Sequence, residues 1–335
     1  MRTLVVGYFG FRNGQLDGQT VKTRSILELY QEKKVSVDYF DTQILQKNKL
    51  YIVFLIYKIF KSKEIIYLPG YNNLKNFGKT ILTISRLLKI NINYFVVGGW
   101  LIDFIKENNS FIKLLKEFDC IYVETEFLRE GLLEFGIENV KWFPNFRKTE
   151  FKPAPFRNFT EGTLRVVFMA RVMPEKGIDV LFSVFNGIKE RVSDKEIYLD
   201  IYGQISENYN DNFYTKLCNN RFISYKGVLE PKFIYENITN YDVLILPTFY
   251  EGEGFPGTIV DAYIAGLPVI TTKWKQIPEF VDEGLTGFLV EPHSVNEIID
   301  LLLKLKDNRV LLEEMKINAY LKSKEFSYEK ALTLV

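Results

Sequence analysis

The sequence predicts an α/β protein of two domains, each with a parallel sheet flanked by helices. Its 335 residues exceed what one ordinary domain holds. Short apolar segments alternate with longer amphipathic ones almost throughout, which is typical of parallel strands joined by crossover helices. The proline-bearing segment 152–158 (KPAPFRN) interrupts this alternation, and we expect it to link the domains.

The first domain is expected over residues 1–155. Each of its strands is predicted from a short apolar run rich in β-branched and aromatic residues, and each helix from apolar residues three or four positions apart. The expected strands are 3–8, 35–40, 64–68, 92–97, 119–123 and 139–143. The expected helices are 19–32, 45–62, 74–89, 101–117 and 126–135.

The second domain is expected over residues 156–325, with the same alternation. The expected strands are 164–170, 196–202, 222–226, 241–246, 267–271 and 287–290. The expected helices are 175–191, 209–219, 231–239, 258–265 and 294–325, the last broken near Asp307. Two Rossmann-like domains result, with ligands expected at the carboxyl ends of the strands.

Composition favours an intracellular protein. Hydrophobic residues form 47% of the chain, enough for two packed cores, and its two cysteines, Cys120 and Cys218, indicate a reducing compartment. An apolar strand begins at Thr3, which leaves no room for a signal peptide, and no apolar run approaches the ~20 residues that span a bilayer. We therefore expect a cytoplasmic protein.

Charge is distributed unevenly. Residues 1–89 contain 15 Lys and Arg against 6 Asp and Glu, a net charge of +9, whereas the whole chain has +1. Within this basic part, segment 47–63 (KNKLYIVFLIYKIFKSK) has an apolar middle between lysines. It is either a crossover helix packed on its sheet or a helix that also rests on an anionic membrane surface, with residues 47–89 as the basic contact.

Segment 247–271 (PTFYEGEGFPGTIVDAYIAGLPVIT) has the residues of a nucleotide-sugar site. Glu253 and Asp261 flank a glycine turn, Gly254-Phe255-Pro256-Gly257, that opens a helix at Thr258. Glycines let the backbone approach a ligand, and a helix N-terminus attracts phosphate, while carboxylates bind sugar hydroxyls. In the structural alternative, Thr258 caps the helix and Asp261 is an acid of its first turn.

The same segment resembles the donor site of family-4 retaining glycosyltransferases. The matching residues are Pro247-Thr248, Glu253, Asp261 and the following Ala265–Ile270. The second acid is Asp instead of the usual Glu, and Glu251-Gly252 lengthens the turn, as in capsule- and exopolysaccharide-assembly members. This resemblance implies the GT-B fold, in which two Rossmann-like domains face each other across a cleft. It also implies that the tail 326–335 returns to the first domain.

Further donor-site residues follow from motif and resemblance together. Arg171 and Lys176 follow the strand 164–170, where a diphosphate needs fixed cations. The resemblance makes both of them diphosphate ligands and Glu253 the catalytic residue. It adds backbone contacts around Gly203 and Val228, the latter beside the base. The complete expected donor site is Arg171, Lys176, Gly203, Val228, Gly254, Phe255, Gly257, Thr258 and Asp261.

The acceptor and diphosphate loop is expected in the first domain. Gly18 opens a helix after a glycine-containing loop, and Gly99 follows a strand. The expected residues of this loop are Asp17, Gly18, Gln19 and Gly99. The one histidine, His293, lies in a turn outside the expected site, so no histidine base is expected. In the family, the departing diphosphate and the acceptor are thought to occupy one face of the sugar, without a protein base.

No metal or other cofactor is expected, because the chain contains no Asp-x-Asp pair and its cations are placed to neutralise the diphosphate. The sequence thus predicts a retaining hexosyltransferase that uses a nucleoside-diphosphate sugar, with UDP expected, and a glycan or lipid-linked glycan acceptor. No nucleic-acid partner is expected. The alternatives are a sugar-nucleotide epimerase of the same fold and a non-catalytic partner subunit of a glycosyltransferase. A dinucleotide oxidoreductase is disfavoured, since neither domain has Gly-x-Gly-x-x-Gly after its first strand.

Overall fold

The computed structural model describes residues 2–12, 14–15, 17–33, 36–153, 163–191 and 197–335. Residues 154–158 of the expected linker, and the expected domain boundary at 155/156, lie outside the described residues. By contacts between residues, the chain divides into two units. One consists of Met1–Lys148, Gly252–Phe255 and Tyr328–Val335, and the other of Thr149–Glu251 and Pro256–Ser327.

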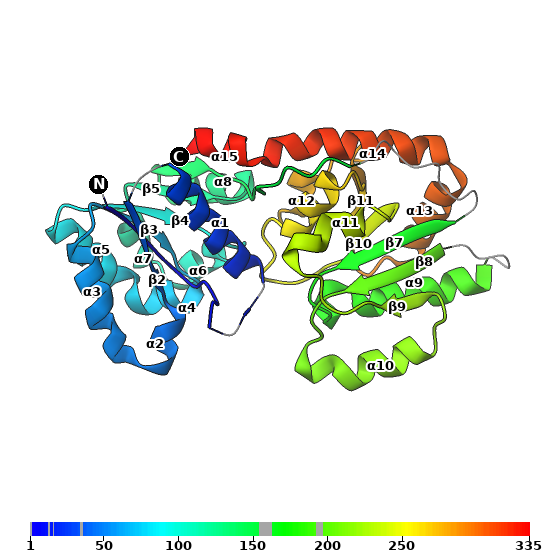
Figure 1. The fold of residues 1–335 in the computed structure, drawn as a ribbon, viewed down its shortest axis with the longest axis horizontal. Helices are drawn as coiled ribbons and strands as arrows, with labels where there is room; N and C mark the ends of the chain where they lie inside the picture. Colours follow the sequence, from blue (N-terminus) through cyan, green and yellow to red (C-terminus); the bar gives the residue numbers. More distant parts are fainter. Residues whose placement is uncertain (1, 13, 16, 34–35, 154–162, 192–196) are drawn as a thin grey trace. The chain divides into compact units, whose positions relative to one another are not determined.

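The first unit contains a parallel six-stranded sheet with the order β2-β1-β3-β4-β5-β6. Its strands are β1 (Arg2–Gly7), β2 (Ser36–Asp41), β3 (Glu64–Leu68), β4 (Asn91–Phe95), β5 (Cys120–Val123) and β6 (Val140–Trp142). Leu4 and Val6 face one apolar core while Val5, between them, faces another. Helices therefore cover both faces of this sheet (Figure 1).

Two helices expected in the first unit, 45–62 and 101–117, are each interrupted by an asparagine. The helices of this unit are α1 (Gly18–Glu32), α2 (Gln43–Lys47), α3 (Ile52–Phe60), α4 (Tyr71–Asn73), α5 (Lys79–Leu87), α6 (Leu101–Glu107), α7 (Phe111–Leu115) and α8 (Glu126–Glu134). Asn48 leaves the helical region and its side chain accepts a hydrogen bond from the backbone of Leu50. Asn108 likewise separates α6 from α7.

The second unit contains another parallel sheet, with the order β12-β11-β10-β7-β8-β9. Its strands are β7 (Leu164–Met169), β8 (Ile197–Tyr202), β9 (Ile223–Tyr225), β10 (Val243–Leu246), β11 (Val269–Thr272) and β12 (Gly287–Val290). All twelve expected strands are thus present within two residues of their predicted ends. Buried parallel strands are continuous apolar runs, which makes them easy to recognise in a sequence.

The helices of the second unit are α9 (Ile178–Arg191), α10 (Asn210–Cys218), α11 (Ile234–Ile238), α12 (Gly257–Ile264), α13 (Val295–Asp307) and α14 (Arg309–Ser323). Short 3₁₀ turns, η3 (Pro174–Lys176) and η5 (Pro231–Phe233), precede α9 and α11. The break near Asp307 is confirmed, since Asn308 caps α14 by accepting a hydrogen bond from the Leu311 backbone. None of the described helices is long and apolar enough to cross a bilayer.

A further helix, α15 (Tyr328–Leu334), belongs to the first unit. The rings of Tyr328 and Phe146 lie 6.0 Å apart. Tyr328 and Ala331 share an apolar core with Leu27 and Tyr30 of α1. The end of the chain therefore contributes apolar packing to the first unit.

Candidate functional site

In the second sheet, the order in which the chain adds strands reverses between β7 and β10. The chain proceeds from β7 to β9 on one side, and then returns to form β10 on the other side of β7. In open α/β sheets, ligands bind outside the carboxyl ends of the strands at such a point. The loops that follow β7 and β10 are therefore the elements from which a ligand site is expected here.

These two loops are in close contact. Gly177 has a φ of +85°, and a Cβ at this position would lie 2.2 Å from the carbonyl oxygen of Pro247. Phe249 donates a backbone hydrogen bond to the carbonyl oxygen of Glu175 (2.8 Å), and the Thr248 hydroxyl donates to the same oxygen (3.2 Å). Only glycine fits at position 177. The segment 175–177 is thus joined directly to the segment 247–249.

The two expected cations follow β7. Arg171 is exposed, and the Nζ of Lys176 lies 4.8 Å from the centroid of the Tyr250 ring, a cation–π distance. Gly203 follows β8 with a φ of +145°, and a Cβ there would lie 1.8 Å from the carbonyl oxygen of Ala170. Because only glycine permits this approach, Gly203 lets the loops after β7 and β8 lie together.

Helix α12 begins with Gly257, one residue before its expected start. Pro256 is its N-cap and no side chain caps the helix, so the alternative that Thr258 is a structural cap is wrong. The Thr258 hydroxyl oxygen is buried, with no hydrogen-bond partner among the described residues. An unsatisfied buried hydroxyl at the N-terminus of a helix suits an anionic ligand.

Asp261 lies further along α12, beyond its first turn. Its side chain is buried, and Oδ1 accepts a hydrogen bond from the Tyr235 hydroxyl (3.1 Å). The Tyr235 ring in turn stacks on Phe151 at 5.4 Å. Sequence reasoning did not identify Tyr235, because no local pattern links a helix residue to a carboxylate 26 positions away.

Glu253 lies in the segment Gly252–Phe255, which belongs to the first unit. The residue is 7% exposed. A Cβ on the following Gly254 would lie 2.9 Å from the Cα and carbonyl carbon of Gly98, so glycine is needed there. Phe255 is buried, and its carbonyl oxygen accepts a hydrogen bond from the Asn145 amide (2.7 Å). Gly254, Phe255 and the expected Gly99 are therefore close to one another.

The expected acceptor loop has a clear structural role. Asp17 is the N-cap of α1, accepting from the Thr20 backbone (2.9 Å) while the Thr20 hydroxyl accepts from the Asp17 backbone (2.9 Å). Gly18 is exposed with open space around it. The Gln19 amide lies beside Gly70, 3.1 Å from the position that a Cβ on this glycine would take.

Val228, expected beside the nucleotide base, is 58% exposed after β9. The preceding Gly227 has a φ of +81° and its carbonyl oxygen accepts from the backbone of Gly203 (2.8 Å). The loops after β8 and β9 are therefore joined through their backbone. The valine side chain is left at the surface, available to a flat apolar ligand group.

The turn after β10 has supports that the sequence did not indicate. The indole nitrogen of Trp274 donates to the carbonyl oxygen of Tyr250 (2.9 Å), and the Nζ of Lys275 lies 2.7 Å from a carboxylate oxygen of Glu251. His293 was expected outside the site, but its ring lies 4.2 Å from that of Phe249. All three side chains follow strands β11 and β12 at the same edge of the sheet.

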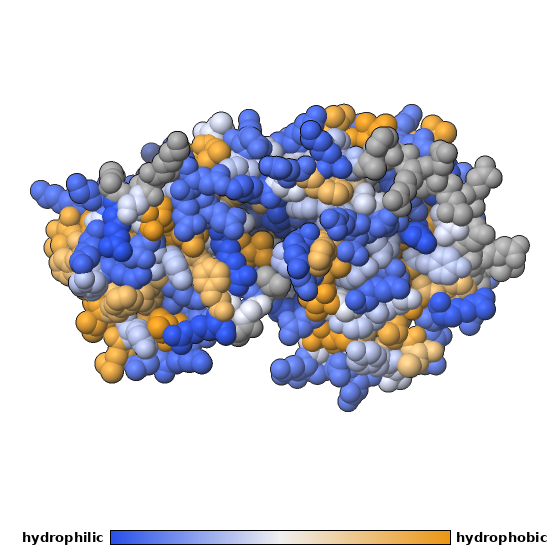
Figure 2. All heavy atoms as spheres, in the orientation of Figure 1, coloured by the Kyte–Doolittle hydropathy of each residue, from blue (hydrophilic) through white to orange (hydrophobic). Residues whose placement is uncertain are grey.

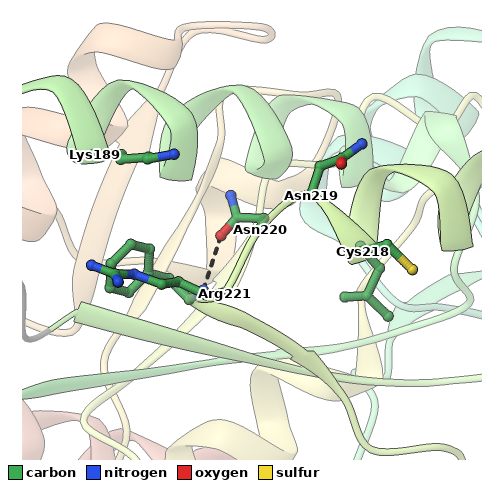
Figure 3. Close-up of a pocket in the computed structure, with 7 residues that line it drawn as sticks. Lys189, Cys218, Asn219, Asn220 and Arg221 are labelled. Atoms are coloured by element: carbon green, nitrogen blue, oxygen red, sulfur yellow. Dashed lines mark hydrogen bonds between the residues drawn. The ribbon is translucent and has the colours of Figure 1, made fainter.

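A cavity of about 370 Å³ lies elsewhere, where α10 ends and β9 begins (Figure 3). Lys189, Cys218, Asn219 and Arg221 are among its lining residues. The side chain of Asn220 accepts a hydrogen bond from the Phe222 backbone (3.0 Å), which orders the turn. This cavity is at the amino end of β9, opposite the expected donor loops. No group of three or more potential metal ligands occurs among the residues described.

Comparison with known proteins identifies the same region. Residues 151–322 match the family model described as glycosyl transferases group 1. The poly(ribitol-phosphate) alpha-N-acetylglucosaminyltransferase of Staphylococcus aureus (strain COL) is 27% identical over 220 residues, 63% of this chain and 41% of that protein. An uncharacterized 41.2 kDa protein in the cps region of Klebsiella pneumoniae is 24% identical over 198 residues, 56% of this chain and 52% of that protein. The chain thus spans about half the length of the curated relatives it matches.

The fold has known counterparts over its whole length. The crystal structure of Anabaena Alr3699/HepE in complex with UDP-glucose has a TM-score of 0.75 and 15% identity, covering 99% of this chain and 97% of that chain. At this identity the likeness shows the fold alone. It confirms the expected GT-B fold, with two Rossmann-like domains.

Proposed function

We propose a specific reaction for this chain, which belongs to the glycosyl transferases group 1 family. The reaction is transfer of a sugar, with retention of anomeric configuration, from a nucleoside-diphosphate sugar to a polysaccharide, glycolipid or other glycan acceptor. UDP is the proposed nucleotide, and the proposed setting is capsule or other polysaccharide synthesis in the cytoplasm. The close contact of Gly177 with Pro247 supports this proposal most directly, because it joins the two loops that contain the candidate donor residues.

The diphosphate is assigned to the loops after β7 and β10. Arg171 and Lys176 supply positive charge, and the buried Thr258 hydroxyl and the backbone N–H groups that begin α12 donate hydrogen bonds. These groups offset the negative charge that develops on the leaving diphosphate, which lowers the barrier. We therefore propose that transfer requires no metal ion, and that activity persists in EDTA.

The two carboxylates have different proposed roles. Asp261, held by the Tyr235 hydroxyl, binds ribose hydroxyls. Glu253 binds hydroxyls of the donor sugar and stabilises positive charge near the anomeric carbon. The acceptor is assigned to the loops of the first unit, where Asp17, Gly18, Gln19 and Gly99 lie beyond the carboxyl ends of their strands.

The first test is calorimetric titration with UDP in EDTA. Lys176→Ala is expected to weaken binding about tenfold, a loss near 1.4 kcal/mol. Lys189→Ala is the matched control, since this lysine is exposed on the adjoining helix α9 and contacts the other cavity. Equal affinities of the two variants would contradict the assigned donor site, and no UDP binding by the wild type would contradict the proposed nucleotide.

Turnover distinguishes the reaction types. The protein is incubated with UDP-glucose, UDP-galactose or UDP-N-acetylglucosamine, with and without glycan acceptors, and the anomeric configuration of the product is read by NMR. Acceptor-dependent transfer with retention is expected. Interconversion of UDP-sugars without an acceptor would identify an epimerase instead, and UDP binding without any turnover would indicate a non-catalytic subunit.

We also propose that α3 contacts an anionic membrane surface. Val53, Phe54, Tyr57 and Phe60 of this helix are 67%, 48%, 51% and 62% exposed, whereas Leu55 and Ile59 are buried. Packing on the sheet therefore accounts for one side of α3 only. Residues 42–63 contain five lysines and no acid, and Lys47, Lys49, Lys61 and Lys63 among them are exposed. Figure 2 shows apolar surface gathered over the α3 part of the first unit.

An apolar helix face bordered by lysines favours the interface of anionic lipids. Co-sedimentation with phosphatidylcholine vesicles, with and without phosphatidylglycerol, tests this proposal. Binding is expected only with the anionic lipid, is expected to weaken with salt, and is expected to be lost in Val53→Ser/Phe60→Ser. Val310→Ser, at an equally exposed position on α14, is the control. Absence of binding to the anionic vesicles at low salt would refute the contact.

A further inference from the structure

Glu253 is held in place by two supports in the first unit. On one side lies the turn after β4, where Gly254 approaches Gly98 so closely that a Cβ would be 2.9 Å from its backbone. On the other side lies the loop after β6, where Asn145 donates to the carbonyl oxygen of Phe255 (2.7 Å). The residues that flank Glu253 are therefore fixed by loops from two separate parts of the sheet.

One buried ammonium group connects these two supports. The Nζ of Lys22, on α1, lies 3.0 Å from Oε1 of Glu124. The other oxygen of Glu124 accepts a hydrogen bond from the backbone of Gly98 (3.2 Å). Lys22 also donates to the carbonyl oxygen of Pro144 (3.4 Å), the residue before Asn145. Lys22 thus contacts the loop after β6 directly and the turn after β4 through Glu124.

The contacts of Lys22 are isolated from water. Lys22 and Glu124 are 3% and 2% exposed, so neither charge is compensated by solvent. The Lys22 ammonium also lies 5.3 Å from the centroid of the Phe143 ring. Burial lowers the pKa of Lys22, and the neighbouring Glu124 carboxylate opposes this effect. A buried ion pair of this kind costs desolvation energy and is poor evidence for stability alone.

From these contacts we infer that Lys22 is a positioning residue for Glu253, acting through the Glu124–Gly98 contact on one side and the Pro144–Asn145 loop on the other. The inference rests on the proposed function, in which Glu253 acts at the donor sugar. Loss of the Lys22 ammonium leaves the Glu124 carboxylate buried without its cation. Gly98 and Pro144 are then no longer connected through Lys22, and the Gly252–Phe255 segment that they support is expected to become more mobile.

Hydrogen exchange of Lys22→Met tests the contact itself. Methionine has a similar length without the charge, so the helix position of residue 22 is retained. Faster exchange is expected in peptides covering 96–100 and 252–256. The matched control is Lys316→Met, because Lys316 is also a buried lysine (4% exposed) paired with a buried carboxylate, Asp242, at 3.3 Å, and belongs to the second unit. Unchanged exchange in Lys22→Met, or the same change in Lys316→Met, would overturn the inference.

Kinetics then test the consequence. In Lys22→Met, kcat for UDP release from UDP-glucose, or from whichever UDP-sugar the wild type uses, is expected to fall about 10- to 100-fold, as for a displaced catalytic group. The Kd for UDP is expected to stay within about twofold, since the diphosphate residues belong to the second unit. Lys316→Met is expected to keep the wild-type kcat. An unchanged kcat in Lys22→Met would refute the positioning role.

The double variant Lys22→Met/Glu124→Gln keeps the inference testable if Lys22→Met fails to fold. It removes the unpaired buried charge but leaves Pro144 without its donor, so folding is expected with kcat still reduced. Full recovery of kcat in the double variant would show that the single variant suffered only from the stranded carboxylate. If the wild type neither binds UDP nor turns over a UDP-sugar, the proposed function fails, while the exchange experiment still decides whether Lys22 holds the segment 252–256.

Discussion

Lys275 holds Glu251 at two points: its Nζ lies 2.7 Å from the Glu251 carboxylate and donates to the Glu251 carbonyl oxygen at 2.5 Å. Lys275 has a φ of +47°, in the left-handed region that a lysine adopts only at a cost of about 1 kcal/mol or more. Glu251 belongs to the two-residue extension of the turn after β10. The strained lysine is therefore the support of the feature that departs from the commonest family pattern.

Replacing Lys275 by glycine is expected to loosen this turn. Glycine accepts the left-handed backbone, so the fold is retained, but both contacts with Glu251 are lost. The Glu251 carboxylate is 78% exposed, which limits the ion pair to about 1 kcal/mol, so the backbone hydrogen bond is the larger contribution.

We expect UDP affinity or kcat to fall about tenfold in Lys275→Gly, measured by calorimetry and by UDP release. Glu251→Gln is expected to have little effect, because the carbonyl oxygen of residue 251 remains. Lys273→Ala is the control, since this neighbouring lysine pairs with Glu291 at the surface, 3.2 Å away. Wild-type UDP affinity and kcat in Lys275→Gly would show that Lys275 does not support the turn after β10.

Glu253 and Asp261 are expected to differ in which kinetic constant they affect. In the role proposed for Glu253, Glu253→Gln removes a charge near the anomeric carbon, so kcat is expected to fall about 100-fold while UDP binding is retained. Asp261→Asn is expected to weaken UDP binding about tenfold, because the ribose contact proposed for Asp261 would be present in both ground and transition states. Tyr235→Phe is expected to weaken UDP binding less than Asp261→Asn does, since it removes the hydrogen bond to Oδ1 but keeps the carboxylate. A larger loss of UDP affinity in Glu253→Gln than in Asp261→Asn would contradict the proposed division of roles between the two acids.

The sequence predicted the sheets better than the helices. A buried parallel strand such as Val243–Leu246 is apolar throughout, so its position is visible without knowledge of its neighbours. At Asn48 and Asn108 the backbone leaves the helical conformation, and a single asparagine in the sequence does not predict such a change. The motif around Glu253 and Asp261 was visible because its residues are close in sequence.

The supports of the site were not predicted, since they are long-range contacts. Trp274 and Lys275 reach back 24 residues, and Asn145 reaches 110 residues ahead. For Lys22 a signal did exist. It lies four residues before Ile26 and seven before Leu29, so it is on the apolar stripe of α1, where an ordinary solvated lysine is not expected.

Lys316 is expected to matter for stability rather than for the reaction. Its Nζ donates to the carbonyl oxygen of Tyr241 (2.9 Å) and lies 3.3 Å from the carboxylate of Asp242, joining α14 to the start of β10. Lys316→Met leaves the buried Asp242 with Arg309 at 3.9 Å as its nearby cation. The expected loss is about 3 kcal/mol of unfolding free energy, the lower end of the range for a broken buried pair.

Urea unfolding at neutral pH measures this loss, provided that the transition remains two-state. Lys322→Met on the same helix is the control. Its partner Asp282 is 46% exposed at 2.9 Å, so less than about 1 kcal/mol is expected. Equal losses in the two variants would show that burial of the Lys316 pair has no special effect on stability.

Alkaline pH is expected to unfold the protein through its buried tyrosines. Burial is the largest cause that raises the pKa of nine tyrosine hydroxyls above the usual value of about 10, and the rise is large for seven of the nine. These seven residues are Tyr30, Tyr67, Tyr94, Tyr122, Tyr209, Tyr241 and Tyr263. The folded state keeps these protons when the unfolded state loses them. Stability is therefore complete below pH ~10 and falls above it, by about 1.4 kcal/mol per pH unit for each tyrosine.

The buried lysines act in the opposite direction. Burial lowers the pKa of Lys22 and of Lys316, so folding becomes more favourable as pH rises toward their ordinary value of about 10.5. Two lysines do not offset seven tyrosines, and a typical stability of about 5–15 kcal/mol is exhausted within about two pH units above 10.

Absorbance at 295 nm and circular dichroism, followed together from pH 8 to 12, check this expectation. The buried tyrosines should ionise only together with loss of secondary structure. Tyr94→Phe is the informative variant, because the Tyr94 hydroxyl is buried with no hydrogen-bond partner among the described residues. Its removal costs no hydrogen bond, so equal or higher stability at pH 7 and a later alkaline transition are expected. Ionisation of all twenty tyrosines near pH 10 with the fold intact would contradict the burial of these hydroxyls.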